Sequence, residues 1–471
     1  MATVVVVGAL SYLALHLFEP SLSLTWGYAH LNRYPGAWLT ALAFAFSLPT
    51  IARYLDALPI ARRPMPAPSW KLALGFALGA GALFLAIGWF VPTKPFSLDT
   101  SSFAIQVWKG ETWTMRWYLL LATFTGLLRF AEWAWPAPVP ARDLVPIVNA
   151  FLSGFSYALL AGSARRLGRD AFEVCVITLL AWTAFGNLQL ALYYVDVYPF
   201  VQFVFALFLW TALRTLLDDV HPAWPIGIAM LAPFFYLGLL LLLPAAGLIV
   251  IVTLQRERAV RRLGAAFTAV VVGFGLATLP AYGRPFALGP LLADLSETPT
   301  ARLGLSPDSS LLPIGYMLSA AHLWEWVHTF ILIDGVGFLL CATTGIPLLL
   351  RFLRGDAITP PGLLILLLGP VLVYSFTMDP LWGPYWDWDL FSYAAVPTSV
   401  FGAYSLVRWF RDTRELRAAL AGLLIAASVV HLAARLNTVE FDQARHTRES
   451  PPHVPLRAPG DAAPYWQDGT E

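Results

Sequence analysis

The chain has 471 residues, of which 58% are hydrophobic and only 13% are charged. This composition excludes an ordinary soluble domain and predicts an all-helical protein that crosses a membrane many times. The 30 Lys and Arg residues nearly balance the 29 Asp and Glu residues, so the basic surplus of a nucleic-acid-binding protein is missing. The sequence contains no Walker loop and no CxxC or HExxH motif, which would indicate a nucleotide or metal site.

Apolar runs and basic groups alternate along the first third of the chain. Residues 1–18 are apolar, and they predict a first span rather than a signal peptide. Spans over 37–50 and 72–91 flank a basic connection that we expect to be cytoplasmic. The first long external loop, 92–142, contains a span-like stretch over 117–135. We interpret this stretch as a helix in the outer interface, because counting it as a crossing would place the next arginine cluster outside.

The middle and the last third of the chain continue this alternation. The apolar run 223–254 is 32 residues long and lies between two cytoplasmic ends. It is too long for one crossing and short for two, so it predicts a hairpin of short helices turned near Tyr236 or broken at Pro244. The remaining spans are predicted over 144–161, 174–194, 201–217, 263–280, 327–350, 363–377, 391–409 and 416–433.

These assignments give about thirteen crossings on the roughly 20-residue rule. The arginine clusters all fall on the cytoplasmic side, where they are interpreted as topology determinants. A second long external loop is expected over 282–326. Residues 1–435 are expected to form a single transmembrane domain, followed by a polar external tail over 436–471. The two cysteines, Cys175 and Cys341, lie in apolar runs and are interpreted as buried small hydrophobes.

The stretch Trp382–Phe391 is the most unusual polar feature of the chain. It places Asp387 and Asp389 among three tryptophans and a tyrosine, between two apolar runs. Aromatic rings stack on sugars and lipid headgroups, and carboxylates bind hydroxyls or cations, so the stretch suits a polar ligand. The charge alternation places further polar residues on the same external side: Asp99, Asp196, His322 and Asp379. Four separate segments are therefore predicted to meet in one external cleft.

Five motifs resemble those of one family of membrane enzymes. The stretch Trp386-Asp-Trp-Asp-Leu-Phe391 is like Arg-Asp-Trp-Asp-Leu-Phe, which begins a late span in that family. Tyr194-Val-Asp-Val-Tyr198 is like Tyr-Val-Glu-Asn-Tyr, and the run from Tyr236-Leu-Gly to Pro244 is like a His-Leu-Gly…Pro hairpin. Ser319-Ala-Ala-His-Leu323, followed by Glu325 and His328, is like Ser-x-x-His-Leu-x-Asp-x-x-Asn, and Phe96-Ser-Leu-Asp-Thr100 is like Phe-Leu-Gly-Asp-Gly. The chain thus resembles the GT-C class of membrane glycosyltransferases, and in particular its bacterial members that are not tied to a substrate.

The resemblance implies a GT-C-like fold, a sugar donor linked to polyprenyl phosphate, and transfer at the outer face of a bacterial inner membrane. Asp99 is then the general base that takes the proton of the acceptor hydroxyl as it attacks the anomeric carbon. Arg284 or a divalent cation would stabilise the leaving lipid phosphate, although no set of metal ligands is predicted. Substrate contacts are implied for Asp196, Tyr198, Arg284, His322, Trp386, Asp387 and Asp389.

Departures from the family pattern leave open a second hypothesis, a non-catalytic membrane subunit with a protein partner. Leu98 and Thr100 stand where the family has glycines beside its Asp, Tyr236 stands for the hairpin His, and Val197 stands for an Asn. A third hypothesis is a lipid or solute transporter, which requires polar groups along a path through the membrane. Asp334, inside an apolar run, is the main residue in its favour.

The candidate residues also have purely structural interpretations. Asp99 and Asp196 each precede a helix-like run and suit an N-cap. Asp387 and Asp389 suit an interfacial turn in a tryptophan belt, although two neighbouring carboxylates repel each other unless they share a ligand. His322 suits an interface histidine whose hydrogen bonds are satisfied within the protein.

Overall fold

The computed structural model describes residues 2–17, 37–90, 107, 118–135, 141–192, 197–256, 259–282, 314–355, 359–378 and 391–436. The elements within these ranges are helices, as the composition predicts. The first are α1 (Ala2–Leu17), α3 (Ala37–Ala57), η2 (Pro59–Arg62), α4 (Trp70–Phe90), α6 (Tyr118–Ala134), α7 (Ala141–Leu167), α8 (Ala171–Thr183) and α9 (Phe185–Ala191). The next are α10 (Tyr198–Leu217), α11 (Ala223–Leu231), η3 (Ala232–Phe234), η4 (Leu237–Leu242), α12 (Leu243–Leu254) and α13 (Ala259–Tyr282). The last are α16 (Ile314–Met317), α17 (Ala320–Leu340), the π-helical turn η5 (Cys341–Gly345), α18 (Ile346–Leu353), α19 (Pro361–Thr377), α21 (Ala395–Trp409) and α22 (Arg414–Leu436).

Several of these helices can cross a membrane. Within the described ranges, six helical runs are long and apolar enough, or seven if the bent pair α8–α9 is counted as one span. The six are Trp70–Gly88, Asp143–Leu167, Tyr198–Leu217, Leu237–Leu254, Ala320–Leu353 and Arg414–Leu432. The chain is therefore an all-helical protein with several candidate spans, which fits a multi-pass membrane protein; the expected count of about thirteen is not shown. Three of the other predicted crossings coincide with shorter apolar helices, at Ala2–Ser11, Ala223–Phe234 and Pro361–Thr377.

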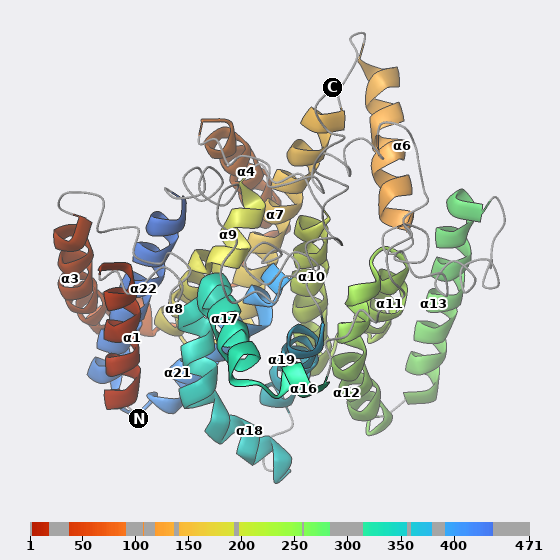
Figure 1. Ribbon diagram of the computed structural model, residues 1–471. Coiled ribbons are helices and arrows are strands. Elements are labelled where there is room, and N and C mark those ends of the chain that lie inside the picture. The colour runs from red at the N-terminus through yellow and green to blue at the C-terminus, as the bar shows by residue number, and fades with distance from the viewer. Residues whose placement is uncertain are drawn as a thin grey trace.

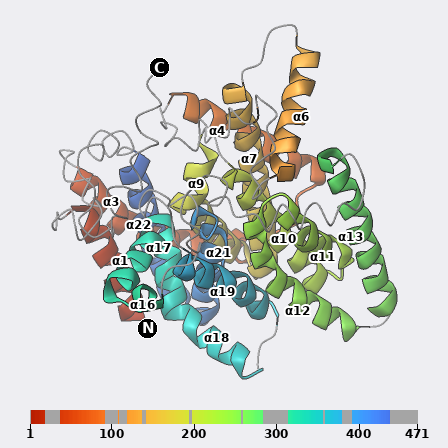
Figure 2. The ribbon, with the colours of Figure 1, turned by 45° about the vertical axis from the view of Figure 1, so that its right-hand side comes forward.

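The helices form one bundle with two flanks (Figures 1 and 2). On one flank α22 packs against α3 and α1, and on the opposite flank α13 packs against α11 and α12. Between them α7 packs against α4 and α10, and α21 packs against α17 and α8. The buried hydrophobic core runs continuously from α8 and α10 to α21 and α22. Residues from distant parts of the chain therefore share one interior.

Glycines allow the closest helix crossings. Gly154 on α7 faces α4, where a Cβ added at Gly154 would lie 2.3 Å from the carbonyl oxygen of Ala77 and 2.6 Å from the amide nitrogen of Gly81. Small residues at such crossings let two backbones approach within van der Waals contact in a membrane.

The substitution Gly154→Ala is expected to lower the free energy of unfolding by about 1–3 kcal/mol, because the added methyl group forces α4 and α7 apart. Gly79→Ala on α4 is the matched control, since a Cβ at Gly79 meets no atom within 4 Å. Thermal unfolding of the two variants in the same detergent measures the difference. Equal effects would contradict the close crossing of α4 and α7.

The run 223–254 forms the hairpin that its length predicts. The chain leaves the end of α10 as α11 and η3, turns at Tyr236 in extended conformation (φ −153°, ψ 120°), and returns as η4 and α12. Pro244 lies in the first turn of α12, where its missing N–H costs no helical hydrogen bond. Both predicted features, the turn at Tyr236 and the boundary at Pro244, are present.

Two helices are broken. The axes of α8 and α9 differ by 64° at a break at Ala184, so the span predicted over 174–194 is bent. The second break is at Asp334 in α17, where the backbone is extended (φ −161°, ψ 68°). The ring of Trp326 lies 5.8 Å from that of Phe338, whereas the same step along a straight helix is about 18 Å. The span predicted over 327–350 therefore consists of two arms folded side by side (Figure 1).

Candidate functional site

The structure describes two of the predicted site residues, Tyr198 and His322. The others lie outside the described residues: Asp99, Asp196, Arg284, Trp386, Asp387 and Asp389. The tail after residue 436 lies outside them as well, so the division into one domain and a tail stays a prediction. The described helices that flank the Trp382–Phe391 stretch are α19 and α21, and the candidate site is built on their ends.

His322 contacts the last turn of α19. Its Nε2 lies 2.8 Å from the carbonyl oxygen of Phe376, and its ring packs against the Phe376 ring at 4.8 Å. Because a carbonyl only accepts, Nε2 carries the proton in this contact. The His322 side chain is buried, and the backbone N–H of His322 donates to Ser319 Oγ at 3.1 Å, which makes Ser319 the N-cap of α17. The prediction of a histidine satisfied within the protein is therefore confirmed for Nε2.

Trp326 makes the second contact between α17 and this turn. Its indole Nε1 donates to Ser375 Oγ at 3.0 Å, and its ring lies edge-on to Phe376 at 5.7 Å. In the preceding residue, the carboxylate of Glu325 accepts a hydrogen bond of 2.5 Å from the Tyr316 hydroxyl. Glu325 and His328, which belong to the Ser319–His328 motif, are both buried.

A group of tyrosines lies on the other side of α19. The Tyr374 ring lies 6.3 Å from Phe391 and 6.5 Å from Tyr393, at the residues that lead into α21. Tyr198 meets Tyr236 edge-on at 6.2 Å, and η4, which begins after Tyr236, packs against both α19 and α10. Tyr236 is also a neighbour of Tyr393, which contacts Tyr374. The hairpin apex, the start of α10 and the last turn of α19 therefore lie in one region.

This arrangement offers aromatic faces and hydroxyls, which are the groups that bind sugars and lipid headgroups. Among the described residues, no group of three or more His, Cys, Asp or Glu side chains is arranged to hold a metal ion. Both cysteines are free; Cys341 is partly buried, but Cys175 is exposed on α8, which corrects its interpretation as a buried hydrophobe.

The carboxylate of Asp334 accepts hydrogen bonds within the protein, which explains the position of this residue inside an apolar run. Its Oδ1 accepts from the backbone N–H of Gly337 at 2.9 Å, and its Oδ2 accepts from the Thr398 hydroxyl at 2.7 Å. Asp334 thus caps the second arm of α17, in the position that an N-cap occupies. A Cβ at Gly337 would lie 1.9 Å from Asp334 Oδ2, so only glycine leaves room for the capping carboxylate.

An amide can make the same cap, so Asp334→Asn is expected to change the free energy of unfolding by less than about 1 kcal/mol, whereas Asp334→Ala is expected to lower it by about 1–3 kcal/mol. Chemical unfolding in detergent measures both variants. If Asp334 instead carried protons along a transport path, Asp334→Asn would reduce transport as strongly as Asp334→Ala. If Asp334→Asn lost as much stability as Asp334→Ala, the role of Asp334 as a helix cap would be contradicted.

Side chains bind the carbonyl groups that the two breaks release. At the α8–α9 break, the Tyr157 hydroxyl donates to Trp182 O at 2.9 Å, and Asn187 Nδ2 donates to Ala181 O at 2.7 Å. Two residues of α22 take part: the Ser428 hydroxyl donates to Thr183 O at 2.9 Å, and His431 Nε2 lies 2.9 Å from Leu332 O, beside the α17 break. Broken helices inside a membrane require such partners.

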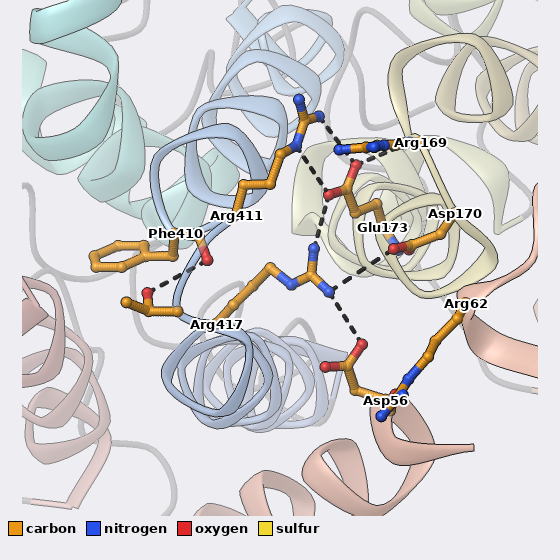
Figure 3. Close-up of polar contacts among 9 residues, drawn as sticks. Asp56, Arg62, Arg169, Asp170, Glu173, Phe410, Arg411 and Arg417 are labelled. Atoms are coloured by element: carbon orange, nitrogen blue, oxygen red, sulfur yellow. Dashed lines mark hydrogen bonds and ion pairs between the residues drawn. The ribbon is translucent and has the colours of Figure 1, made fainter. Parts of the chain in front are cut away.

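The opposite end of the bundle holds a buried group of charges, which we call the basic-end cluster: Asp56, Asp170, Glu173, Arg411 and Arg417. Arg417 Nη1 donates to Glu173 at 2.7 Å and Nη2 to Asp56 at 3.0 Å (Figure 3). The side chains of Arg417, Glu173 and Asp56 are 2%, 1% and 7% exposed, so these charges are held by one another rather than by water. Arg411 approaches the other oxygen of Glu173 at 3.3 Å.

Local structure places Glu173 in this cluster. The Asp170 carboxylate accepts from the backbone N–H of Glu173 at 2.9 Å, and Glu173 accepts from the backbone N–H of Arg169 at 2.8 Å. Asp170 is therefore the N-cap of α8, and Glu173 binds the backbone N–H of the residue before that cap. The acids thereby lie at the positive end of the α8 dipole, where negative charge is stabilised.

Arginines at the end of α7, after α12 and in the first turn of α13 lie at the same end, as the charge alternation predicts. Arg166 at the end of α7 pairs with Asp218 after α10 at 2.7 Å, and Asp219 pairs with Arg256 and Arg262 at 2.7 Å each. The hydrogen bond from Arg262, together with the charges of Arg262 and Arg256, lowers the pKa of Asp219 to about 2.

Sequence reasoning missed the basic-end cluster as a site, because its arginines were interpreted as topology determinants. One signal was available: Asp170 and Glu173 at capping-box spacing directly after three arginines. Comparison with known proteins adds no functional assignment: no protein-family model, curated protein or solved structure matches this chain.

Proposed function

We propose that the chain is a membrane glycosyltransferase of GT-C architecture. It would take a sugar from polyprenyl phosphate at the outer face of a bacterial inner membrane and transfer it to a glycan, lipid or protein acceptor. The expected topology of about thirteen crossings, with both long loops outside, belongs to this proposal.

One observation carries the proposal. Residues from four of the five motifs gather around the last turn of α19: Tyr198, Tyr236, His322 and Phe391. These motifs are far apart in the sequence, and their described residues come together at the end of the bundle opposite the basic-end cluster. Aromatic rings and hydroxyls at that end suit a sugar and its lipid phosphate.

In the proposed reaction, an acceptor hydroxyl attacks the anomeric carbon and loses its proton to Asp99. The bond between that carbon and the phosphate oxygen breaks, and polyprenyl phosphate leaves. Arg284 or a divalent cation would stabilise the phosphate.

Transfer can be tested with the purified protein in nanodiscs, a radiolabelled polyprenyl-phosphate sugar and a membrane extract as acceptor. The proposal expects release of polyprenyl phosphate together with label in the acceptor fraction. In sealed proteoliposomes, passage of intact donor across the bilayer without bond cleavage would favour a transporter instead. Donor binding without cleavage under any acceptor condition would favour the non-catalytic subunit.

A further inference from the structure

Two side chains of α17 hold the last turn of α19. His322 Nε2 donates to Phe376 O at 2.8 Å, and Trp326 Nε1 donates to Ser375 Oγ at 3.0 Å. We call this pair of hydrogen bonds the α17–α19 clamp. The two donors lie four residues apart on one face of the first arm of α17, and their acceptors are adjacent residues of α19.

The clamp satisfies groups that α19 itself leaves open. The last four carbonyls of a helix have no partner within the helix, and Phe376 is among them, since α19 ends at Thr377. His322 supplies the missing donor. The Ser375 hydroxyl donates to Leu372 O at 3.0 Å, so its oxygen is left to accept from Trp326.

The first arm of α17 is itself firmly held. The Trp326 ring is packed against Phe330 at 5.2 Å, Phe338 at 5.8 Å and Phe376 at 5.7 Å. Because the break at Asp334 folds the helix back, Phe338 comes from the second arm. The indole therefore connects both arms of α17 to α19.

The held turn of α19 is also the turn that carries Tyr374. Tyr374 contacts Phe391 and Tyr393, which lead into α21, and Phe391 is the last residue of the Trp386–Phe391 motif. A shift of this turn would move the aromatic group on which the proposed substrate site is built.

We propose that His322 and Trp326 are positioning residues, which hold the carboxyl end of α19 for substrate binding, and that His322 does not bind the substrate itself. The Nε2 proton of His322 is already used within the protein. The link to substrate rests on the proposed function, whereas the clamp rests on geometry alone.

The test compares three variants of the full-length protein with one control. His322→Phe and Trp326→Phe keep an aromatic ring and remove the N–H donor, and His322→Gln keeps an N–H donor of similar reach. Trp324→Phe makes the same change two residues away, on a side chain that is 49% exposed. Hydrogen exchange of the α19 amides is measured by mass spectrometry, and kcat and KM are measured with a polyprenyl-phosphate sugar.

The clamp predicts about ten-fold faster exchange at the end of α19 in His322→Phe and Trp326→Phe. It predicts a similar rise in the donor KM with little change in kcat. His322→Gln and Trp324→Phe are expected to behave as the wild type in both measurements.

Wild-type exchange in His322→Phe would overturn the clamp. If His322→Gln showed normal exchange but the same raised KM as His322→Phe, the imidazole would be a direct ligand of the substrate. That result would also overturn the proposal. Faster exchange in the Phe variants, rescued by Gln, in a protein that turns over no donor would support the clamp and reject the proposed function.

Discussion

Replacing Arg417 with methionine is expected to lower the free energy of unfolding by about 3–5 kcal/mol, the largest loss of stability that the structure predicts. The reason is the charge left behind. Without Arg417, the 1%-exposed Glu173 keeps the backbone N–H of Arg169 and the longer 3.3 Å contact to the Arg411 cation, and Asp56 loses its 3.0 Å partner. Two nearly buried carboxylates then lack the cation that balances them. Equilibrium unfolding in detergent, followed by tryptophan fluorescence, measures the loss.

Arg414→Met is the matched control, because Arg414 is exposed one turn earlier on the same helix. It is expected to change stability by less than about 0.5 kcal/mol. A buried ion pair is also often replaceable as a whole by apolar residues. The triple variant Asp56→Leu, Glu173→Met, Arg417→Met is therefore expected to be more stable than Arg417→Met alone. If Arg417→Met and Arg414→Met were equally mild, the cluster would not be the tie between α3, α8 and α22.

Replacing Asp99 with asparagine is expected to reduce glycosyl transfer about 10²–10⁴-fold, because the amide cannot accept the proton of the acceptor hydroxyl. Asparagine is as good an N-cap as aspartate, so the folded protein and its unfolding temperature are expected to be unchanged. Transfer from a radiolabelled polyprenyl-phosphate sugar measures the rate, and thermal unfolding measures the fold.

Asp99→Ala separates the two interpretations of this residue. A cap would cost about 1 kcal/mol of stability in Asp99→Ala while transfer by Asp99→Asn stayed normal. A base would show loss of transfer in both variants. Normal turnover by Asp99→Asn would remove Asp99 as the base.

The hairpin at 223–254 illustrates what hydropathy predicts well. A 32-residue apolar run between two ends that are expected to be cytoplasmic can form few structures in a membrane, because the bilayer thickness fixes the length of a crossing. The turn at Tyr236 and the boundary at Pro244 follow from that constraint. The position of Arg166, Arg256 and Arg417 at one end of the bundle follows in the same way from charge alternation.

The breaks in α8–α9 and α17 could not be predicted in the same way. No proline lies at Ala184, and the neighbouring Gly186 packs so that a Cβ would lie 2.8 Å from the carbonyl oxygen of Ser392. Residues that are distant in the sequence, such as Ser428, support the bend, and the local sequence around residue 184 does not reveal them. At Asp334 the acid was visible in the sequence, but Thr398, its second partner, is 64 positions away.

The contacts of the basic-end cluster and of His322 could not be predicted from the sequence either. Arg417 looks like its exposed neighbours in sequence, and its burial depends on Asp56, 361 positions earlier. The external position of His322 was predictable, but its partner, the carbonyl of Phe376, is a backbone group that no motif marks.

The most direct test of the account is photo-crosslinking with a polyprenyl phosphate that carries a diazirine, bound to the protein in nanodiscs and mapped by mass spectrometry. The proposed site predicts labelled peptides from residues 194–198, 319–328 and 382–391, with the labelling competed by unmodified polyprenyl phosphate. Label confined to the basic end, around Glu173 and Arg417, or scattered without competition would contradict a single lipid-phosphate site around the last turn of α19.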